Sequence, residues 1–357
     1  MTYFCAVRVN LKMKILVGIS GGVDSAFAAR LLKNEGHEVE GAVLKMHEYT
    51  ELEEAFSAAE SIGIPLHVVD CTEPFDNIIR KNFVEEYLAG RTPNPCIICN
   101  ERVKFRMLYD YAMERGFDAI ATGHYAKIRK IDADGDVRYA FCVSEDSAKD
   151  QTYMLYRLPQ ETMAKLVLPL GDYCKADVRK KAAELGISVA DRPDSQEICF
   201  LPDGDHCGYI ESVAGKCPEG DFVDAEGRVL GRHKGIIHYT VGQRKGLGIA
   251  LGERAFVTKI NPIENTVTLS SRAEGVRFVE VFDLVFSGMP TADEGVKMNL
   301  TAKLRYSAKG IPCTAHFGKE GRVTLEFETP VKAAPGQSAV LYRDGEVMLG
   351  GFILSGF

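Results

Sequence analysis

Two features of the sequence point to chemistry: a glycine-rich segment near the start and a small set of cysteines. Residues 18–25 read Gly-Ile-Ser-Gly-Gly-Val-Asp-Ser and follow the apolar run Lys14–Val17. Glycines let a backbone turn tightly and leave N–H groups uncovered, which favours binding of an anion such as phosphate. Cys96 and Cys99 lie three residues apart, and Cys199 lies in a distant segment. Such thiols serve as nucleophiles, redox partners or metal ligands.

The glycine-rich segment differs from the commoner phosphate-binding loops. A Walker A loop has a lysine after its second glycine, where this chain has Val23 and Asp24, and the three-glycine spacing of dinucleotide-binding turns is absent. An aspartate beside phosphates suits a metal ion that binds with them. The string Ser-Gly-Gly-x-Asp-Ser at 20–25 resembles the PP-loop of enzymes that split ATP into AMP and pyrophosphate. An ordinary glycine-rich turn between a strand and a helix is the alternative interpretation.

The elements that position these groups alternate between strand and helix. Apolar residues recur every three or four positions after Val23, which predicts a helix that ends at Gly36. We then expect strands at 38–44, 65–70 and 118–122 and helices at 51–62, 75–89 and 102–115. This order indicates an α/β fold with a doubly wound parallel sheet. Because ligands bind at the carboxyl ends of such strands, the segments 18–25, 44–46 and 122–124 should surround one crevice.

The sequence pattern of the second half of the chain predicts mainly β-structure. The α/β pattern breaks at Pro202–Asp205, and strand-like runs with glycine turns follow at 220–224, 235–239, 255–260 and 266–269. Strands then recur at short spacing, at 276–286, 300–306, 313–317, 323–327 and 338–342, which indicates a small β-barrel. We therefore expect an N-terminal extension at 1–12, a catalytic domain at 13–202, a small central domain at 203–272 and a C-terminal β-barrel at 273–357.

Composition restricts the class of protein. A chain of 357 residues with 46% hydrophobic and 26% charged residues indicates a globular protein of two or three domains. No run reaches the roughly 18 apolar residues of a membrane span, and we see no export signal. Ten cysteines in such a chain favour reduced thiols and a cytoplasmic location. The net charge of −7 does not favour nucleic-acid binding, but basic clusters at 102–106, 232–245 and 303–309 suit contacts with RNA.

The Cys96-x-x-Cys99 pair is ambiguous on its own. A four-cysteine zinc site needs a second such pair, which the sequence lacks. A thioredoxin-like motif opens a helix directly after a strand, whereas prolines at 93 and 95 predict that residues 90–100 form a loop without helix. Cys199, where the α/β pattern ends, is the third candidate thiol.

Several segments in a fixed order carry a more specific signal: 20–25, 91–95 with Cys99-Asn100, 122–125, 149–153, 194–200, 240–248, 305–306 and 335–338. Together they resemble the tRNA-specific 2-thiouridylase family of PP-loop ATP pyrophosphatases. The resemblance runs from Met13 nearly to the C-terminus. It implies an adenine nucleotide α-hydrolase-like catalytic domain, a small tRNA-binding central domain and a C-terminal β-barrel.

The resemblance implies that ATP activates the wobble uridine of a tRNA. The C2 oxygen of uracil is a poor leaving group, so it would be adenylated with release of pyrophosphate and then replaced by sulfur, which gives 2-thiouridine. Cys199 is implied to carry the sulfur as a persulfide, supplied by a sulfur-carrier or cysteine-desulfurase relay protein. Cys99 is implied to be the nucleophile, and a Cys99–Cys199 disulfide would form as sulfur leaves and be reduced afterwards.

The resemblance also implies binding residues. ATP is expected to contact Gly18, Ile19, Ser20, Gly21, Gly22, Val23, Asp24, Ser25, Leu44 and Gly123. Contacts with tRNA are expected at His124, Lys149, Asp150, Gln151, Arg305, Tyr306 and Gln337. Asp24 and the serine hydroxyls of the loop would help to place Mg²⁺ and pyrophosphate.

Two departures from the family pattern leave alternatives open. Many relatives carry aspartate where this chain has Cys96, so Cys96, Cys99 and Cys199 could instead ligate a [4Fe–4S] cluster that delivers sulfide, although we favour the persulfide relay. The segment 45–52 is shorter than in many relatives, which removes the basis for expecting contacts there. Two other classes of function also fit parts of the sequence: a PP-loop synthetase that forms amides on a small substrate, and a non-catalytic module that binds RNA or a cluster.

Overall fold

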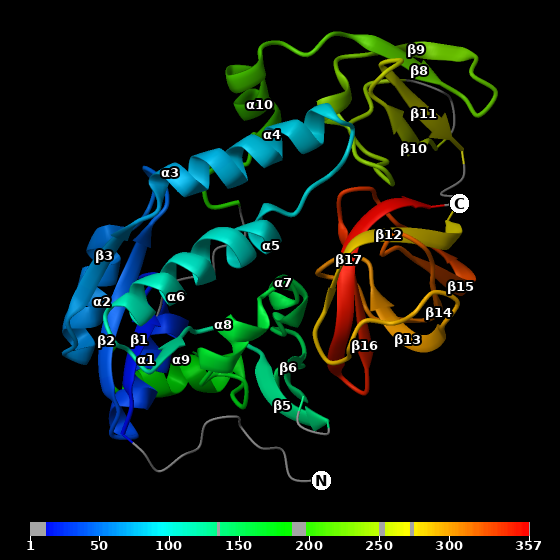
Figure 1. The fold of residues 1–357 in the computed structure, drawn as a ribbon. Coiled ribbons are helices and arrows are strands. Elements are labelled where there is room, and N and C mark those ends of the chain that lie inside the picture. The colour runs from blue at the N-terminus through cyan, green and yellow to red at the C-terminus, as the bar shows by residue number, and fades with distance from the viewer. Residues whose placement is uncertain (1–11, 134–135, 188–197, 250–253, 272–274, 357) are drawn as a thin grey trace.

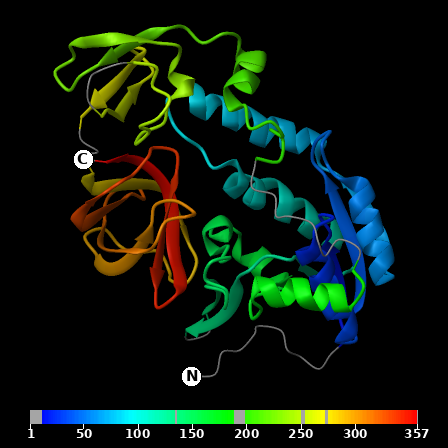
Figure 2. The same cartoon turned by 180° about the vertical axis from the view of Figure 1, so that it is seen from behind.

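The computed structural model describes residues 12–133, 136–187, 198–249, 254–271 and 275–356. The chain forms an α/β part, a small central β-sheet and a C-terminal barrel (Figure 1). Seen from both sides, the α/β part and the barrel stand side by side, and the central sheet lies above the barrel (Figures 1 and 2). The predicted extension at 1–12 falls almost wholly outside the described residues. No helix among the residues that the structure describes is long and apolar enough to cross a bilayer.

The α/β part is built on a parallel sheet, as predicted, but the sheet has a fifth strand, β7, that the sequence analysis did not predict. Its strands are β1 (Lys14–Gly18), β2 (Glu38–Lys45), β3 (Leu66–Asp70), β4 (Ala119–Ala121) and β7 (Leu166–Val167), in the order β3-β2-β1-β4-β7. Val17 on β1 pairs with Gly41 on one side and Ala121 on the other. The order reverses direction between β1 and β4, so the ligand crevice of a doubly wound sheet is expected outside the ends of these two strands.

Helices cover both faces of this sheet. One face packs against α1 (Val23–Asn34), α2 (Leu52–Ile62) and α9 (Lys175–Glu184), and the other against the helices between β3 and β4. The latter are α3 (Thr72–Pro74), the π-helix η1 (Phe75–Arg80), α4 (Lys81–Leu88), α5 (Pro95–Cys99), the π-helix η2 (Asn100–Lys104) and α6 (Phe105–Glu114). Along β1, Ile15 and Val17 belong to the first core and Leu16 to the second, which is the two-residue alternation of a strand buried on both faces.

The prediction that residues 90–100 contain no helix is wrong. Helix α5 begins at Pro95, and the side chain of Asn94 accepts a hydrogen bond from the backbone N–H of Cys96 at 3.2 Å. Proline is tolerated at the first helical position because the N–H that it lacks would have no partner there. The prolines therefore fix where this helix starts.

A β-hairpin that the sequence analysis did not predict leaves the α/β part. It consists of β5 (Lys127–Ala133) and β6 (Asp136–Cys142), and Cys142 pairs with Glu346 of the barrel. Short helices follow it, α7 (Thr152–Leu155) and α8 (Gln160–Lys165). The hairpin gives the α/β part and the barrel a shared sheet.

The central part holds α10 (His206–Ala214) and a sheet in the order β10-β11-β8-β9. Its strands are β8 (Gly220–Val223), β9 (Val229–His233), β10 (Phe256–Asn261) and β11 (Thr266–Ser270). The predicted strand-like run at 235–239 is instead a 3₁₀ turn, η3 (Ile236–His238), preceded by Gly235 with φ +120°. That backbone angle favours glycine and ends the extended conformation.

The C-terminal part is a closed β-barrel, as predicted. Its strands are β12 (Val276–Phe286), β13 (Lys297–Lys303), β14 (Ile311–Phe317), β15 (Val323–Val331), β16 (Ser338–Arg343) and β17 (Glu346–Gly356). Their order is β12-β15-β14-β13-β16-β17, and pairing of β12 with β17 closes the ring. Tyr306 lies in the turn after β13 and not in a strand, as the predicted range 300–306 had placed it.

Candidate active site

The glycine-rich segment forms the turn between β1 and α1. Gly21 has φ +80°, and a Cβ atom there would lie 2.8 Å from Cβ of Glu54, so both the backbone angle and the space require glycine. Gly22 is the N-cap of α1, and glycine has no side chain with which to cap the helix. The first N–H groups of α1 thus have no acceptor on the N-cap residue, which is the arrangement that binds phosphate at a helix N-terminus.

The two serines of the turn hold its shape. The backbone N–H of Ser20 donates to Oγ of Ser25 at 3.2 Å, and Oγ of Ser25 donates to the carbonyl of Gly22 at 3.0 Å. Ile19 and Val23 are buried in the core. These two predicted ATP contacts can therefore reach a ligand only through their backbone atoms.

Gly123, after β4, lies directly against the start of α1. A Cβ atom on Gly123 would lie 2.6 Å from both the carbonyl carbon of Asp24 and the nitrogen of Ser25. No side chain fits between these backbones, so the turn after β4 and the turn after β1 form adjoining walls. Leu44, the predicted contact near the end of β2, is buried at the same edge of the sheet.

Asp24 is held by two side chains from other segments. Its Oδ1 accepts a hydrogen bond from the Tyr125 hydroxyl at 2.8 Å, and its Oδ2 pairs with Nζ of Lys175 at 2.6 Å. Lys175 is the first residue of α9 and is buried, at 8% exposure. The carboxylate of the loop is thus oriented and neutralised by a neighbouring helix.

His124 follows Gly123 and lies beside α6. Its Nδ1 shares a hydrogen bond with Oγ1 of Thr122 at 2.9 Å, and its ring lies 5.4 Å from the ring of Phe105. Burial, with the positive charge of Lys104 nearby, lowers the pKa of His124 to about 3. The imidazole is therefore neutral at physiological pH.

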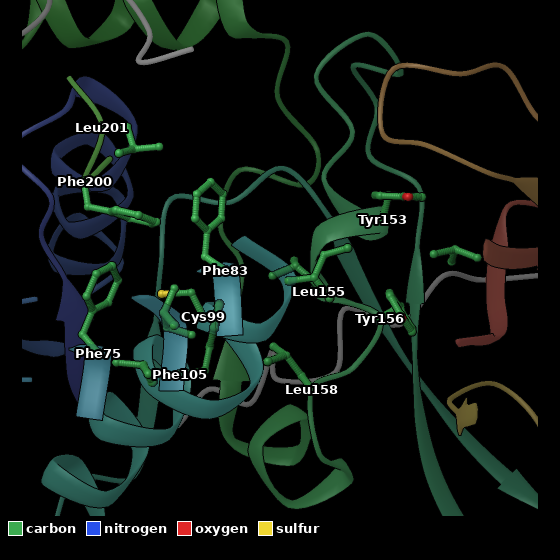
Figure 3. Packing of buried hydrophobic residues seen from close by; sticks show 14 of the residues in the cluster. Phe75, Phe83, Cys99, Phe105, Tyr153, Leu155, Tyr156, Leu158, Phe200 and Leu201 are labelled. Atoms are coloured by element: carbon green, nitrogen blue, oxygen red, sulfur yellow. The ribbon is translucent and has the colours of Figure 1, made fainter. Parts of the chain in front are cut away.

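Cys99 is the last residue of α5 and lies near the end of β2, at the same edge of the sheet as the glycine-rich turn. Its thiol is 6% exposed and lies 3.9 Å from Sδ of Met46, the residue after β2. Figure 3 shows Cys99 among Phe75, Phe83, Phe105 and Phe200. Burial raises the pKa of Cys99 to about 12, so its thiol keeps its proton until another group removes it.

The thiols of Cys96 and Cys199 lie in the same neighbourhood. Each is exposed, unlike Cys99, and each raises the pKa of Cys99 by its negative charge when ionised. Burial raises the pKa values of all three thiols, and the Lys104 ammonium offsets part of that rise. Phe200, next to Cys199, packs edge-on against Phe75 and Phe83 at 5.6 and 5.3 Å and so anchors this end of the segment. The fold therefore brings together two thiols that are a hundred residues apart in sequence.

The predicted contacts with tRNA fall into two sets. Asp150 is buried and accepts hydrogen bonds from the N–H of Ser144 and the hydroxyl of Thr152. The side-chain carbonyl of Gln151 accepts from the N–H of Tyr125 at 2.8 Å. These two side chains bond within the protein, and Lys149 lies partly buried beside them.

The second set lies on the barrel. Arg305 and Tyr306 are exposed in the turn after β13, and the Tyr306 ring lies 6.2 Å from Tyr153. Gln337 donates to the carbonyl of Thr92 at 2.7 Å, in the segment that leads to Cys99. Arg305 and Tyr306 thus present side chains to solvent, whereas Gln337 bridges the barrel and the α/β part.

Sequence reasoning missed three residues that the structure places at the site. They are Lys175 beside Asp24, Lys104 beside the thiols, and Met46 in contact with Cys99. Lys175 is one of several basic residues in its helix, and only the fold shows that it is the buried one. The signal for Lys104 was its place in the basic cluster at 102–106, which we had interpreted as an RNA-binding surface.

Comparisons with known families match the whole described architecture. Residues 13–203 match the family described as tRNA methyl transferase HUP domain, and residues 208–271 match the tRNA methyl transferase PRC-barrel domain. Residues 285–354 match the aminomethyltransferase beta-barrel domain.

Full-length relatives carry a different description. The tRNA-specific 2-thiouridylase MnmA of Clostridioides difficile is 42% identical over 96% of this chain and 98% of its own length. The protein of the same name from Clostridium acetobutylicum is 43% identical over 96% of this chain and its own full length. Among solved structures, a 4-thiouridine synthetase in complex with RNA and ATP aligns with 53% of this chain and 45% of its own, at 20% identity and a TM-score of 0.37.

Proposed function

The chain belongs to the tRNA-specific 2-thiouridylase family, and we propose that it thiolates the wobble uridine of a tRNA. In this reaction sulfur replaces the C2 oxygen of the base, and ATP is cleaved to AMP and pyrophosphate. The observation that carries the proposal is the shared location of two sites. A phosphate-binding turn and a buried thiol lie at the same edge of one parallel sheet. An ATP-dependent sulfurtransferase needs both within reach of one base.

Adenylation uses the glycine-rich turn. The uncapped N-terminus of α1 binds the phosphates of ATP through backbone N–H groups, and Gly18, Gly123 and Leu44 line the adjoining space. The C2 oxygen of the uridine attacks the α-phosphate, the bond to pyrophosphate breaks, and the base is left as an adenylate. AMP is then a far better leaving group than the original oxygen.

The residues at the turn fit Mg²⁺. Asp24 and the hydroxyls of Ser20 and Ser25 offer the oxygen ligands that Mg²⁺ prefers, and each Asp24 oxygen keeps a lone pair after its bond to Tyr125 or Lys175. Bound there, Mg²⁺ would neutralise charge on the departing pyrophosphate. Lys175 holds Asp24 in place for this task.

Sulfur transfer uses the two cysteines. Cys199 is exposed and accepts a sulfur from a relay protein as a persulfide, and its terminal sulfur attacks C2 of the adenylated base while AMP leaves. Cys99 then attacks Sγ of Cys199, its proton passes to the departing base, the persulfide S–S bond breaks, and 2-thiouridine is released with a Cys99–Cys199 disulfide. A dithiol reductant returns both thiols. The exposure of Cys199 and the burial of Cys99 suit a receiving thiol and a resolving thiol.

A [4Fe–4S] cluster on Cys96, Cys99 and Cys199 is the alternative sulfur carrier. In the described part of the chain, no three Cys, His, Asp or Glu side chains are arranged to hold a metal ion. We therefore derive no step through a cluster and favour the persulfide. Iron and acid-labile sulfide in protein purified without oxygen would support the cluster, and full activity without either would exclude it.

Methyl transfer, which the family descriptions mention, is less well supported by the site. That reaction needs a methyl donor and no nucleotide cleavage, whereas the turn has the features of a phosphate site. A PP-loop synthetase for a small substrate would use the turn but has no need of Cys99 and Cys199. Activity that survives replacement of both cysteines by serine would favour that synthetase.

The tRNA would lie across the α/β part and the barrel, with Arg305 and Tyr306 as contacts from the barrel. We keep five further residues as proposed contacts with tRNA: His124, Lys149, Asp150, Gln151 and Gln337. Where one of these side chains already has a hydrogen bond within the protein, the residue would contact the RNA through its backbone atoms or would exchange that hydrogen bond for one to the RNA. Because phosphate contacts release counterions, we expect tRNA affinity to fall steeply with salt. The wobble base must leave its stack to reach Cys199. We place the reaction in the cytoplasm, where thiols stay reduced.

The proposal is tested by tRNA-dependent exchange of pyrophosphate into ATP. We expect exchange with unmodified tRNA and Mg²⁺, and little without tRNA. Binding of tRNA without any exchange would indicate a non-catalytic RNA-binding module and would contradict the proposed enzyme.

A further inference from the structure

Arg157 joins the segment that carries Cys99 to the barrel. Its guanidinium donates to both oxygens of Glu101, from Nε at 2.8 Å and from Nη2 at 3.2 Å. The same group donates from Nη1 to the carbonyl oxygen of Asp283 at 3.0 Å, and Nη2 lies 3.0 Å from the Asp283 carboxylate. Glu101 is two residues after Cys99, and Asp283 belongs to β12 of the barrel.

The Arg157–Glu101 part of this contact is buried and has a defined geometry. The Arg157 side chain is 4% exposed, and its guanidinium lies 4.8 Å from the centre of the Phe352 ring. A planar guanidinium that donates two hydrogen bonds to one carboxylate fixes the orientation of the two groups as well as the distance between them. Removal of one partner would leave a buried charge without compensation, so the link is costly to break.

The barrel is distorted at the point of contact. Asp283 has φ +51°, an angle that non-glycine residues rarely adopt, and the pairing of β12 with β17 shifts register between Phe282 and Val285. Such bulges redirect the backbone groups of a strand and occur often beside active sites. Here the bulged residue is the one whose carbonyl and carboxylate both face Arg157.

The same barrel also holds the segment before Cys99. The side chain of Gln337 donates to the carbonyl of Thr92, and the N–H of Thr92 donates to the carbonyl of Pro335 at 2.9 Å. Helix α5 continues without a break into η2 and α6. The segment of Cys99 is thus joined to the barrel directly at Thr92, before the helix, and through Arg157 at Glu101, within η2.

We propose that Arg157 is a positioning residue for sulfur transfer, which fixes Cys99 relative to the barrel that binds the tRNA. The inference rests on the proposed function. Through this link the barrel, which binds the RNA, also determines the position of the resolving thiol of Cys99. Loss of the Arg157 contacts should displace Cys99 relative to Cys199 but should leave the affinity for tRNA unchanged.

The test compares Arg157→Met with Arg129→Met in the full-length protein. Arg129 pairs with Glu346 and also joins the α/β part to the barrel, but it touches nothing in the Cys99 segment, so it is a matched control. We expect Arg157→Met to thiolate tRNA at least about tenfold more slowly in a single turnover with preloaded persulfide, since small misplacements of reacting atoms are that costly. Its affinity for tRNA should stay within about twofold of the unaltered protein.

A second readout needs no RNA. Under mild oxidation, the Cys99–Cys199 disulfide should form about tenfold more slowly in Arg157→Met than in the unaltered protein or in Arg129→Met. Arg157→Lys keeps the charge but not the planar guanidinium, so its rate of disulfide formation should lie between those of Arg157→Met and the unaltered protein. If Arg157→Met folds poorly, the double variant Arg157→Met with Glu101→Gln removes the carboxylate that would otherwise be left unpaired. Equal disulfide rates in all variants would overturn the inference. If the unaltered protein makes no 2-thiouridine, the proposed function fails, and the disulfide rates still decide the role of Arg157.

Discussion

Nζ of Lys175 lies 2.6 Å from Oδ2 of Asp24, so a lysine from α9 neutralises the only carboxylate of the phosphate-binding turn. The two residues are 151 positions apart in sequence. Their contact joins the start of α1 to the start of α9. An aspartate beside a triphosphate would otherwise repel it. The ion pair explains how the turn can carry a carboxylate and still bind an anion.

We predict that Lys175→Met weakens ATP binding about tenfold. An unpaired Asp24 carboxylate repels the phosphates by roughly 1–2 kcal/mol at the effective dielectric of a protein surface. Calorimetric titration with a non-hydrolysable ATP analogue measures the change. The control is Lys181→Met, an exposed lysine of the same helix. Equal affinity in the two variants would show that Lys175 has no part in nucleotide binding.

Gly123→Ala should impair nucleotide binding more severely. The new Cβ atom would lie 2.6 Å from backbone atoms of Asp24 and Ser25, which cannot give way as a flexible side chain can. The turn after β4 must then move away from α1 and distort the phosphate site. Gly318→Ala, where the nearest atom is 3.7 Å away, is the control. Unchanged ATP affinity in Gly123→Ala would contradict the placement of the site between these two turns.

The two main thiols should differ in reactivity. Burial raises the pKa of both thiols, to about 12 at Cys99, but Cys199 is exposed and Cys99 is buried, so iodoacetamide should modify Cys199 first, as peptide mass mapping can show. Lys104→Met should slow modification of both thiols, because the ammonium lowers both pKa values. The neighbouring Arg106→Met should not. Faster labelling of Cys99 than of Cys199 would argue against their proposed roles.

The neutral His124 predicts a pH dependence of stability. Its pKa in the folded state is about 3, below the 6.5 of a free histidine, so folding excludes a proton. The stability from this group is complete above pH 6.5 and declines as the pH falls from there toward 3, by up to about 1.4 kcal/mol per pH unit. Urea unfolding between pH 7 and 5 should show a shallower decline in His124→Gln. Identical slopes would mean that His124 titrates normally.

The sequence predicted the parallel sheet and the crevice because both follow from local patterns. Residues 14–25 show a buried strand, a glycine turn and an amphipathic helix in succession, and the alternation of such units fixes a parallel sheet. The sequence analysis missed helix α5 because proline usually breaks a helix, whereas Pro95 occupies the first helical position. It also missed the hairpin β5–β6, although the two strands pair locally, from Lys127 with Cys142 to Asp132 with Val137, because it assigned no element to this stretch.

The candidate site divides in the same way. The phosphate-binding turn is contiguous in sequence, so its residues could be named directly. The partners of Asp24 and Cys99 come from other segments, and no spacing rule relates Lys175 or Met46 to them. The prediction that Cys99 and Cys199 act together came from family resemblance, and the residue classes alone left zinc, redox and nucleophilic roles open. Internal hydrogen bonds of Asp150 and Gln151 likewise depend on tertiary structure.

We propose that ATP-dependent activation and two-cysteine sulfur transfer occur at one site. Mass analysis of nucleosides from unmodified tRNA, after incubation with the protein, ATP, Mg²⁺ and a persulfide donor, tests this directly. We predict 2-thiouridine at the wobble position with the unaltered protein, and none with Cys199→Ser or Cys99→Ser, while both variants keep tRNA-dependent pyrophosphate exchange. Absence of 2-thiouridine with the unaltered protein, or its undiminished formation by either variant, would rule out this joint role of ATP and the two cysteines.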